Sequence, residues 1–457
     1  MRLSSINPAT GALLRTYPVW TEARLESMLA ALPDAAACWS ATTMRQRAAL
    51  LLKASHGLRQ HSEAFARLIT KEMGKLIVEA RAEIDKCAWI CEYFAEHGGR
   101  FLAEEAVATE AARSYIAYEP LGTVLAIMPW NFPFWQVFRA AVPALLAGNA
   151  VLLKHAPTVT GCALAVEQLL HDAGWPAGSL QALPIRVEQV QRLLADPRIH
   201  GLSFTGSLQT GREVGKLAGA NIKKAVLELG GSDPFIVLED ADLERTVAQA
   251  IAARFGNAGQ SCIAAKRFIV IDAVADEFVE RFRACVEILR PGDPLDESTT
   301  LAPLARADLR DALRRQVAES LRLGAVPLAG CVPVDGPGYF YPASILDRVQ
   351  PGMAAFDEEV FGPVAAIVRV RDEAEAVDLA NHSRYGLGGS VWTADTRRGE
   401  RVARRLHCGM SFVNAIVKSD PRLPCGGIKD SGHGRELAAH GIKEFTNVKT
   451  VWIAGSA

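Results

Sequence analysis

The sequence predicts an α/β protein with two lobes, each built on a mainly parallel sheet, and three observations lead to that fold class. The chain has 457 residues, more than the roughly 100–200 residues of an ordinary domain. Short, continuous apolar runs alternate with helical segments, a pattern typical of buried parallel strands joined by βαβ crossovers. Two further segments alternate between apolar and polar residues in the manner of strands exposed at a sheet edge.

The first hundred residues are predicted to be mostly helical. Apolar residues recur every three or four positions, with an interruption near Gly74, over residues 21–32, 44–59 and 62–97. The period then changes to alternation, so residues 113–120 are predicted to form an edge strand that Pro120 ends.

Two series of buried strands follow, and each series predicts one parallel sheet. The first series carries helices at about residues 135–146 and 160–173, and its strands lie at residues 124–128, 150–154, 180–183 and 201–205. The second series carries a helix over residues 276–290, and its strands lie at residues 233–238, 267–271, 364–370 and 388–392. The tail at residues 447–453 alternates like residues 113–120, so the two are predicted to form an arm for oligomer contact.

Composition excludes several classes of protein. Apolar residues make up 49% and charged residues 22% of the chain, which rules out long disorder, collagen and coiled coil. Lys and Arg total 50 against 51 Asp and Glu, a net charge of −1, so no global field attracts nucleic acid or anionic lipid. The nine cysteines are an odd number and are expected to be reduced thiols. Because no apolar run reaches a membrane-spanning length and no secretory leader is visible, a cytoplasmic protein is expected.

A cysteine behind a glycine-rich loop is the strongest chemical candidate. The segment Gly256-Asn-Ala-Gly-Gln-Ser-Cys262 places backbone N–H groups near the thiol, where they can lower its pKa and hold an oxyanion. Most of the other cysteines are expected to be inert core residues, and the Gly-Gln-Ser setting distinguishes Cys262 from them. No His–Asp partner pattern accompanies it, which disfavours a papain-like protease.

Two polar residues at strand ends are candidates for acid–base and oxyanion chemistry. Glu228 precedes Leu-Gly-Gly and can act as a general base in a cleft, with a surface glutamate as the alternative. Asn131 lies in Pro129-Trp-Asn-Phe-Pro133, a rigid loop from which its amide can donate to an oxyanion. The alternative for that loop is an aromatic plug over a core.

A third pattern indicates a nucleotide site. Phe204-Thr-Gly-Ser-Leu-Gln-Thr-Gly211 follows a strand and opens a helix, whose N-terminus offers unpaired N–H groups to a pyrophosphate. It is not the G-x-G-x-x-G fingerprint, so this interpretation depends on context. Lys154 ends a neighbouring strand, at the edge where open α/β sheets bind ligands. No H-E-x-x-H and no paired C-x-x-C is present, so no metal is predicted.

Together these motifs resemble the aldehyde dehydrogenase superfamily over essentially the whole chain. They occur in order as Pro-Trp-Asn-Phe-Pro at 129–133, Phe-Thr-Gly-Ser at 204–207, Glu-Leu-Gly-Gly at 228–231, Gly-Gln-Ser-Cys at 259–262, Glu-Glu-Val-Phe-Gly-Pro at 358–363 and Pro-Cys-Gly-Gly-Ile-Lys-Asp-Ser-Gly at 424–432. The resemblance implies a Rossmann-type dinucleotide-binding domain (1–104 and 122–232), an α/β catalytic domain (233–440) and a small β oligomerisation arm (105–121 and 441–457). A homodimer or homotetramer is therefore expected.

The resemblance also implies a mechanism. Cys262 attacks an aldehyde, and Asn131 with the Cys262 backbone N–H holds the oxyanion of the thiohemiacetal. Oxidation by a nicotinamide cofactor leaves a thioester, and Glu228 activates the water that releases the acid. The implied cofactor contacts are Trp130, Lys154, Gly206, Ser207, Gly211, Leu229, Glu359 and Phe361.

Two departures from the family pattern stand out. Many members that prefer NAD carry a glutamate three residues after the lysine, where this chain has Pro157. Losing that carboxylate removes repulsion of a 2′-phosphate, so NADP is predicted to be used at least as well as NAD. Cys425 stands where the family usually has Phe, and nothing in the sequence explains it.

The substrate is predicted from Arg139 and Ser419, which match substrate-binding positions of succinate-semialdehyde dehydrogenases. Arg139 can clamp a distal carboxylate bidentately, and pairing with a surface acid is the alternative. A second arginine of some of these enzymes is Gly256 here. The chain looks most like the compact bacterial succinate-semialdehyde dehydrogenases, which implies oxidation of succinate semialdehyde to succinate. The alternatives are a broad-specificity aliphatic aldehyde dehydrogenase and a CoA-acylating semialdehyde dehydrogenase, although CoA-acylating relatives commonly lack the base at Glu228.

Overall fold

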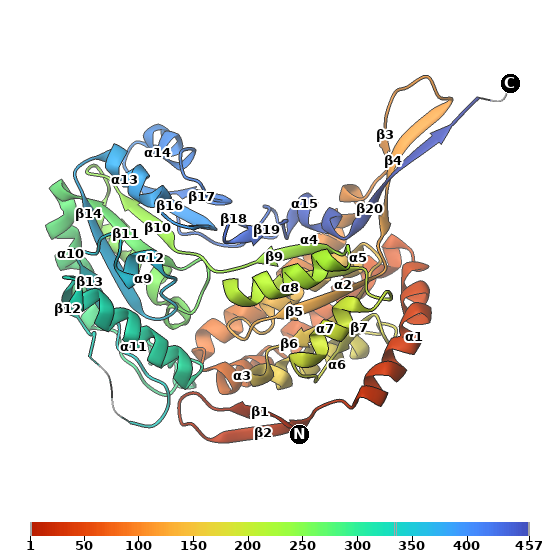
Figure 1. The fold of residues 1–457 in the computed structure, drawn as a ribbon, viewed down its shortest axis with the longest axis horizontal. Helices are drawn as coiled ribbons and strands as arrows, with labels where there is room; N and C mark the ends of the chain where they lie inside the picture. The colour runs from red at the N-terminus through yellow and green to blue at the C-terminus, as the bar shows by residue number, and fades with distance from the viewer. Residues whose placement is uncertain (1, 333, 335, 456–457) are drawn as a thin grey trace.

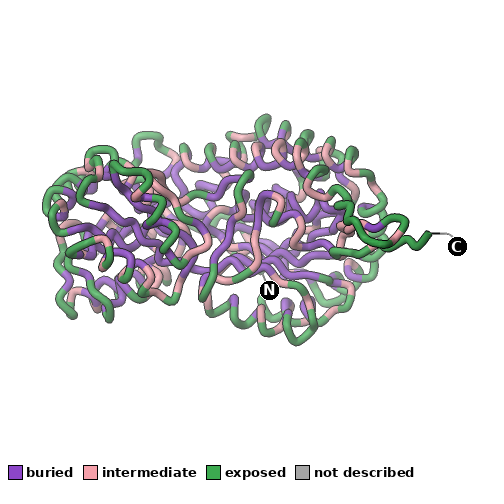
Figure 2. Tube along the Cα trace, turned by 90° about the horizontal axis from the view of Figure 1, so that it is seen from above, coloured by how far each residue is buried: buried purple, intermediate pink, exposed green. Residues whose placement is uncertain are grey.

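The computed structural model describes residues 2–332, 334 and 336–455. Two lobes lie side by side, and a narrow arm projects beyond the lobe that holds the first half of the chain (Figure 1). Buried residues follow the strands through the middle of both lobes, whereas the arm is exposed (Figure 2). The predicted two-lobed α/β architecture is therefore confirmed.

The first lobe contains a six-stranded sheet in the order β19-β9-β8-β5-β6-β7. Its strands are β5 (Thr123–Met128), β6 (Ala150–His155), β7 (Leu180–Ala182), β8 (Gly201–Thr205), β9 (Lys224–Glu228) and β19 (Gly432–His433). The first five are parallel, and β19 is antiparallel to β9. Every residue of β5, β6 and β8 is buried, which explains why these strands appear in the sequence as continuous apolar runs.

Helices cover this sheet and begin and end at residues that the sequence marks. They are α1 (Glu22–Ser40), α2 (Met44–Gln60), α3 (Ser62–Met73), α4 (Ile77–Phe101), α5 (Trp135–Leu146), η1 (Pro157–Val159), α6 (Thr160–Asp172), α7 (Glu188–Ala195) and α8 (Leu208–Ala220). Thr43 and Gln46 form a capping box at the start of α2. Gly74 ends α3 with a φ of 85°, a left-handed conformation that favours glycine.

The first helix is longer than the segment 21–32 whose spacing predicts it, because α1 continues through Pro33 to Ser40. Trp39 near its end stacks on Trp175 with 4.8 Å between ring centroids. The Trp39 indole N–H also donates to the Leu145 carbonyl at 3.1 Å. Burial of this large side chain offsets the hydrogen bond that an interior proline removes.

The second lobe contains a seven-stranded sheet in the order β12-β13-β14-β11-β10-β16-β17, parallel except for β12. Its strands are β10 (Asp233–Val237), β11 (Ala265–Ile271), β12 (Val326–Ala329), β13 (Ser344–Asp347), β14 (Val364–Val370), β16 (Gly388–Trp392) and β17 (Met410–Val413). Its helices are α9 (Leu243–Phe255), η2 (Gly256–Gly259), α10 (Asp272–Glu287), α11 (Ala307–Arg322), α12 (Ala354–Asp357), α13 (Glu373–Asn381) and α14 (Thr396–Ala403).

Short elements complete the chain. The hairpin of β1 (Arg2–Ile6) and β2 (Leu13–Pro18) lies below the first lobe, and β15 (Tyr385–Gly386) pairs with β18 (Ile428–Lys429) (Figure 1). The two alternating segments form one antiparallel sheet, as predicted, in the order β20 (Thr446–Ile453), β4 (Arg113–Pro120), β3 (Glu105–Ala106). The oligomer contact itself stays a prediction.

One expected domain boundary does not follow the strand pairing. Residues 432–433 were expected within the unit 233–440, yet β19 hydrogen-bonds to β9 of the first lobe. The helix α15 (Ala438–Glu444) that follows contacts α4 and α5 of the same lobe. The chain therefore crosses back between the lobes before it enters the arm, and the rest of the domain division stays a prediction.

Candidate active site

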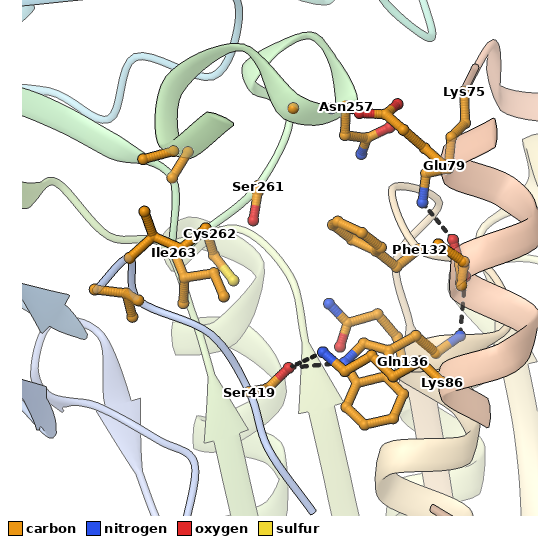
Figure 3. A pocket seen from close by; sticks show the side chains of 18 of the residues that line it. Lys75, Glu79, Lys86, Phe132, Gln136, Asn257, Ser261, Cys262, Ile263 and Ser419 are labelled. Carbon is orange, nitrogen blue, oxygen red and sulfur yellow. Dashed lines mark hydrogen bonds and ion pairs between the residues drawn. The ribbon is translucent and has the colours of Figure 1, made fainter. Parts of the chain in front are cut away.

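A cavity of about 320 Å³ lies where segments of the two lobes meet. One wall consists of α4 and the start of α5, and the opposite wall consists of α9, η2 and the loop that carries Cys262. Residues 416–419 close a third side. The Cys262 side chain faces this space from the second lobe, and Gln136 and Lys86 face it from the first (Figure 3).

The loop before Cys262 depends on left-handed backbone conformations. Asn257, Ala258 and Gly259 have φ values of 52°, 53° and 71°. A Cβ at Gly259 would collide with the carbonyl of Gly362, so glycine is required there. The Asn257 side-chain amide donates to the carbonyls of Asn131 at 3.0 Å and Gln260 at 3.1 Å. In the sequence, these backbone conformations and hydrogen bonds were indicated only by a glycine-rich stretch.

Cys262 is half-buried at the end of that loop. Burial raises the pKa of its thiol to about 11, although the cationic Arg139 and Lys266 oppose that rise. The Lys266 ammonium donates to the carbonyls of Ser261 at 2.8 Å and Cys262 at 2.6 Å, which holds the loop in place. Desolvation of the thiolate outweighs the neighbouring positive charges, and the expected contribution of the loop N–H groups stays a prediction.

Asn131 follows β5 and is 4% exposed. Its side-chain amide donates to the Gln260 carbonyl at 3.0 Å, and its side-chain oxygen is buried without a partner. The loop is anchored by Glu83 of α4, which accepts the backbone N–H groups of Phe134 and Trp135 at 2.9 Å each and pairs with Lys75. Sequence reasoning missed Glu83, whose only signal is an acidic residue on an otherwise buried helix face.

Glu228 ends β9 and is only 2% exposed, so the surface alternative is wrong. Burial raises the pKa of its carboxyl to about 8, while the Arg139 cation opposes the rise. One carboxylate oxygen has no hydrogen-bond partner, and the other lies 3.9 Å from an Arg139 nitrogen. A buried carboxyl that titrates near neutral pH is suited to general-base chemistry.

Arg139 lines the cavity and is 3% exposed. Its guanidinium forms an ion pair with Glu436 and contacts the Thr205 hydroxyl at 3.3 Å. The Cys425 thiol lies 3.8 Å away, so this cysteine packs against the arginine. Glu436 is a buried acid that sequence reasoning missed, and the carboxylate clamp by Arg139 stays a prediction.

Ser419 lies in the cavity wall between two donors. Its hydroxyl accepts from the Lys86 ammonium at 2.9 Å and from the Trp135 indole N–H at 3.1 Å (Figure 3). The Lys86 ammonium also lies over the Trp135 ring, 4.1 Å from its centroid. Sequence reasoning missed Lys86 as a cavity residue, although it continues the α4 face of Glu79 and Glu83 at helical spacing.

The predicted nucleotide residues lie at the ends of β6, β8 and β9. Lys154 is buried, and its ammonium donates to the His155 carbonyl at 3.2 Å. Ser207 caps α8 by accepting the Thr210 N–H. The Gly206 N–H donates to the Glu228 carbonyl at 3.0 Å, which ties this helix start to the strand that carries Glu228.

The remaining predicted cofactor residues form contacts around the same edge. A Cβ at Gly211 would collide with the Leu229 side chain, so the close packing of α8 on the segment after β9 requires glycine. The Gly231 N–H donates to the Glu359 carboxylate at 3.0 Å, and Lys266 lies 3.7 Å from it. Trp130 and Phe361 pack edge to face with 5.8 Å between centroids. The segments after β5 and β9, which carry Trp130 and Leu229, therefore contact the segment that carries Glu359 and Phe361.

Two negative findings apply to the part of the chain that the structure describes. No group of three or more His, Cys, Asp or Glu side chains has the arrangement of a metal site. No helix combines the length and apolar character needed to cross a bilayer.

Known proteins resemble this chain over its full length. A model of the aldehyde dehydrogenase family matches residues 1–451. Succinate semialdehyde dehydrogenase Sad of Escherichia coli K12, whose name specifies NAD(P)+, is 48% identical over 449 residues, which are 98% of this chain and 97% of that protein. The probable succinate-semialdehyde dehydrogenase of Synechocystis, whose name specifies NADP+, is 45% identical over 454 residues, 99% of this chain and 100% of that one.

A solved structure agrees with these sequence matches. Succinic semialdehyde dehydrogenase from Streptococcus pyogenes, in complex with NADP+, superposes with a TM-score of 0.97 at 37% identity and covers 99% of this chain and 100% of its own. The order of the motifs, the two-lobed fold and the cavity that holds Cys262 agree with these similarities. The chain therefore belongs to the aldehyde dehydrogenase family.

Proposed function

We propose that this protein oxidises succinate semialdehyde to succinate with NADP or NAD as the electron acceptor. The observation that carries the proposal is that one cavity presents the Cys262 thiol together with cationic and hydroxyl groups, Arg139, Lys86 and Ser419. A cavity of about 320 Å³ suits a small aldehyde, and buried cations favour one with a distal carboxylate. The names of the relatives support the same substrate.

The residues around Lys154 fit a dinucleotide with an extra phosphate. Burial lowers the pKa of the Lys154 ammonium to about 8, and in the described chain no carboxylate lies within 4 Å of it. A buried ammonium whose partner is a single carbonyl is stabilised by a nearby anion. Lys154, Ser207 and Glu359 would hold the cofactor, and a bound nicotinamide supplies the two-electron acceptor.

Cys262 is the proposed nucleophile. In the free protein the thiol is mostly protonated, so attack draws on the small thiolate fraction that Arg139 and Lys266 stabilise. The thiolate forms a bond to the aldehyde carbon, and the carbonyl oxygen becomes an oxyanion. The second hydrogen of the Asn131 amide, the one not donated to Gln260, and the Cys262 backbone N–H hold that oxyanion.

Glu228 is the proposed base of the second half-reaction. After oxidation the acyl group is attached to the Cys262 sulfur as a thioester. The Glu228 carboxylate takes a proton from water as the water oxygen attacks the acyl carbon. The carbon–sulfur bond then breaks, which releases the acid and returns the thiolate.

A substrate panel tests this proposal. We expect kcat/KM for succinate semialdehyde to exceed that for butanal by about tenfold or more. Only succinate semialdehyde has a carboxylate that the buried cations can bind. Reduced nicotinamide is expected to form without CoA. Equal kcat/KM for both aldehydes would favour the broad-specificity alternative, and a requirement for CoA would favour the acylating one.

Cofactor preference is tested with Lys154→Met. The variant is expected to lose about tenfold in kcat/KM with NADP but little with NAD, because the lost charge would attract the 2′-phosphate. A wild-type preference for NAD above about tenfold would contradict the proposed use of NADP.

The arm is proposed to hold a homodimer or homotetramer in the cytoplasm. Val448, Trp452 and Ile453 of β20 are exposed by 59%, 49% and 44%, and exposed apolar groups on a projecting strand favour contact with a second copy. Sedimentation of the protein and of a Trp452→Asp variant tests this. A monomeric wild type would contradict the proposal.

A further inference from the structure

Three cationic side chains line the cavity, and they differ in how their charges are balanced. Lys75 is paired with Glu83, and Arg139 is paired with Glu436. Lys86 lines the same space, and no described carboxylate lies within 4 Å of its ammonium. Its partners are the neutral Ser419 hydroxyl at 2.9 Å and the Trp135 ring. Lys86 is therefore the cavity cation whose charge is left for a ligand.

At the other end of the cavity, near the start of α4, the Glu79 carboxylate lies close to Lys75, whose charge is already paired with Glu83. Glu79 accepts the Asn257 N–H at 2.7 Å with one oxygen, and its other oxygen is buried without a partner. A Cβ at Gly256 would meet only this carboxylate, at 3.7 Å, so the loop of the second lobe adds no cation there. Glu79, Lys75 and Asn257 lie at one end of the cavity, and Ser419, Gln136 and Lys86 lie at the other (Figure 3). A bound carboxylate is therefore directed toward Lys86.

We propose that Lys86 binds the distal carboxylate of the substrate, beside Arg139, and so determines the preference for a charged aldehyde. Arg139 by itself is a poor sole clamp, since its guanidinium is already neutralised by Glu436 and lies 3.9 Å from Glu228. The Ser419 hydroxyl and the Trp135 ring hold the lysine head in place. This inference rests on the proposed function, because it assigns the residue that selects the substrate of that same site.

The surroundings of Lys86 make its charge responsive to a ligand. Burial lowers the pKa of the ammonium to about 8, with opposing contributions from Cys425, Cys87 and Glu83 and a further lowering by Arg139. A carboxylate seated beside it would raise that pKa again. Substrate and proton binding at Lys86 are thereby coupled.

The test replaces the charge while keeping the side-chain stem. Lys86→Met and Lys86→Arg are compared with wild type on succinate semialdehyde and butanal at pH 7. Lys86→Met is expected to raise KM for succinate semialdehyde about 10- to 100-fold, as expected for loss of a charged hydrogen bond, with KM for butanal within about twofold. Lys86→Arg is expected to restore most of the preference. Lys71→Met, the same change at an exposed position of α3, is the matched control and should leave both KM values unchanged.

The outcomes separate this inference from the proposed function. A wild type that does not favour succinate semialdehyde over butanal overturns the proposed function. A wild type that does, with a Lys86→Met variant that keeps the same ratio of the two KM values, overturns the assignment of Lys86. Butanal turnover reports correct folding of the variant. If Lys86→Met loses both activities, the polar Lys86→Gln variant is judged by the same ratio, and a ratio equal to that of wild type again overturns the assignment.

Discussion

The two walls of the cavity are held in place by different interactions. The loop from Gly256 to Cys262 is fixed by strained backbone and by hydrogen bonds that Asn257, Gln260 and Lys266 donate to its backbone carbonyls. The facing wall of α4 and α5 is fixed by buried ion pairs, Lys75 with Glu83 and Arg139 with Glu436. The difference indicates that the loop sets the position of the nucleophile, whereas the wall sets the charge that the substrate meets. Changes in the loop should therefore affect all aldehydes alike, and changes in the wall should discriminate among them.

The largest effect is expected at Glu228, the proposed base, which lies 3.9 Å from Arg139 of the wall. Glu228→Gln removes proton transfer from water, so steady-state kcat should fall about 10²–10⁴-fold for every aldehyde. A stoichiometric burst of reduced cofactor should remain, because thioester formation does not use this carboxylate. Stopped-flow absorbance measures both quantities. Glu280→Gln, an exposed acid on α10 without an ion pair among the described residues, is the control. A loss of the burst would contradict the assigned order of steps.

The next largest effect is expected when the ion pair between Arg139 and Glu436 is broken. Glu436→Gln leaves the Arg139 charge without its main partner, and breaking a buried pair costs about 3–5 kcal/mol in unfolding free energy. The freed guanidinium should also interact more strongly with Glu228 and lower the pKa of that carboxyl. Urea denaturation and the pH profile of kcat measure the two effects. A stable variant with an unshifted pH profile would show that the pair does not influence the base.

Gly259→Ala tests the loop. The added Cβ would meet the Gly362 carbonyl at a φ of 71°, so the loop must shift and move the thiol. A displacement of about 1 Å typically costs about 10²-fold in rate, and the loss should be equal for charged and neutral aldehydes. Gly219→Ala in α8, where a Cβ meets nothing within 4 Å, should keep full activity. A loss confined to succinate semialdehyde would contradict the division between the two walls.

The smallest effects are expected from a change in pH. An increase in pH should raise kcat through Glu228 and weaken the binding of succinate semialdehyde through Lys86. Glu228 works as a base only when ionised, so kcat should rise as pH increases through about 8. Lys86 attracts a carboxylate only when protonated, so KM for succinate semialdehyde should rise as pH increases above about 8, by about tenfold per pH unit at most. KM for butanal should stay level over the same range. If KM changed with pH in the same way for succinate semialdehyde and butanal, the assigned role of the Lys86 charge would be contradicted.

Much of the fold was predictable because it depends on local periodicity. The buried strands, the helix over residues 135–146 and the separate arm follow from apolar spacing and from Pro and Gly positions. Candidates Cys262, Glu228 and Asn131 stood out because each lies in a short segment of unusual composition. The full length of α1 did not follow from local spacing, since the burial of Trp39 against a distant Trp175 outweighs the local effect of Pro33.

The sequence by itself determined the order of elements and the chemical groups available, since these depend on neighbours along the chain. Only the tertiary structure decided which charges are neutralised and which remain for a ligand. Ser419 and Lys86 are 333 positions apart yet hydrogen-bonded, and Arg139 forms an ion pair with Glu436, which is also far away in the sequence. The pKa values of Cys262 and Glu228 likewise depend on removal from water. Desolvation and pairing act through space, so no local pattern in the sequence records them.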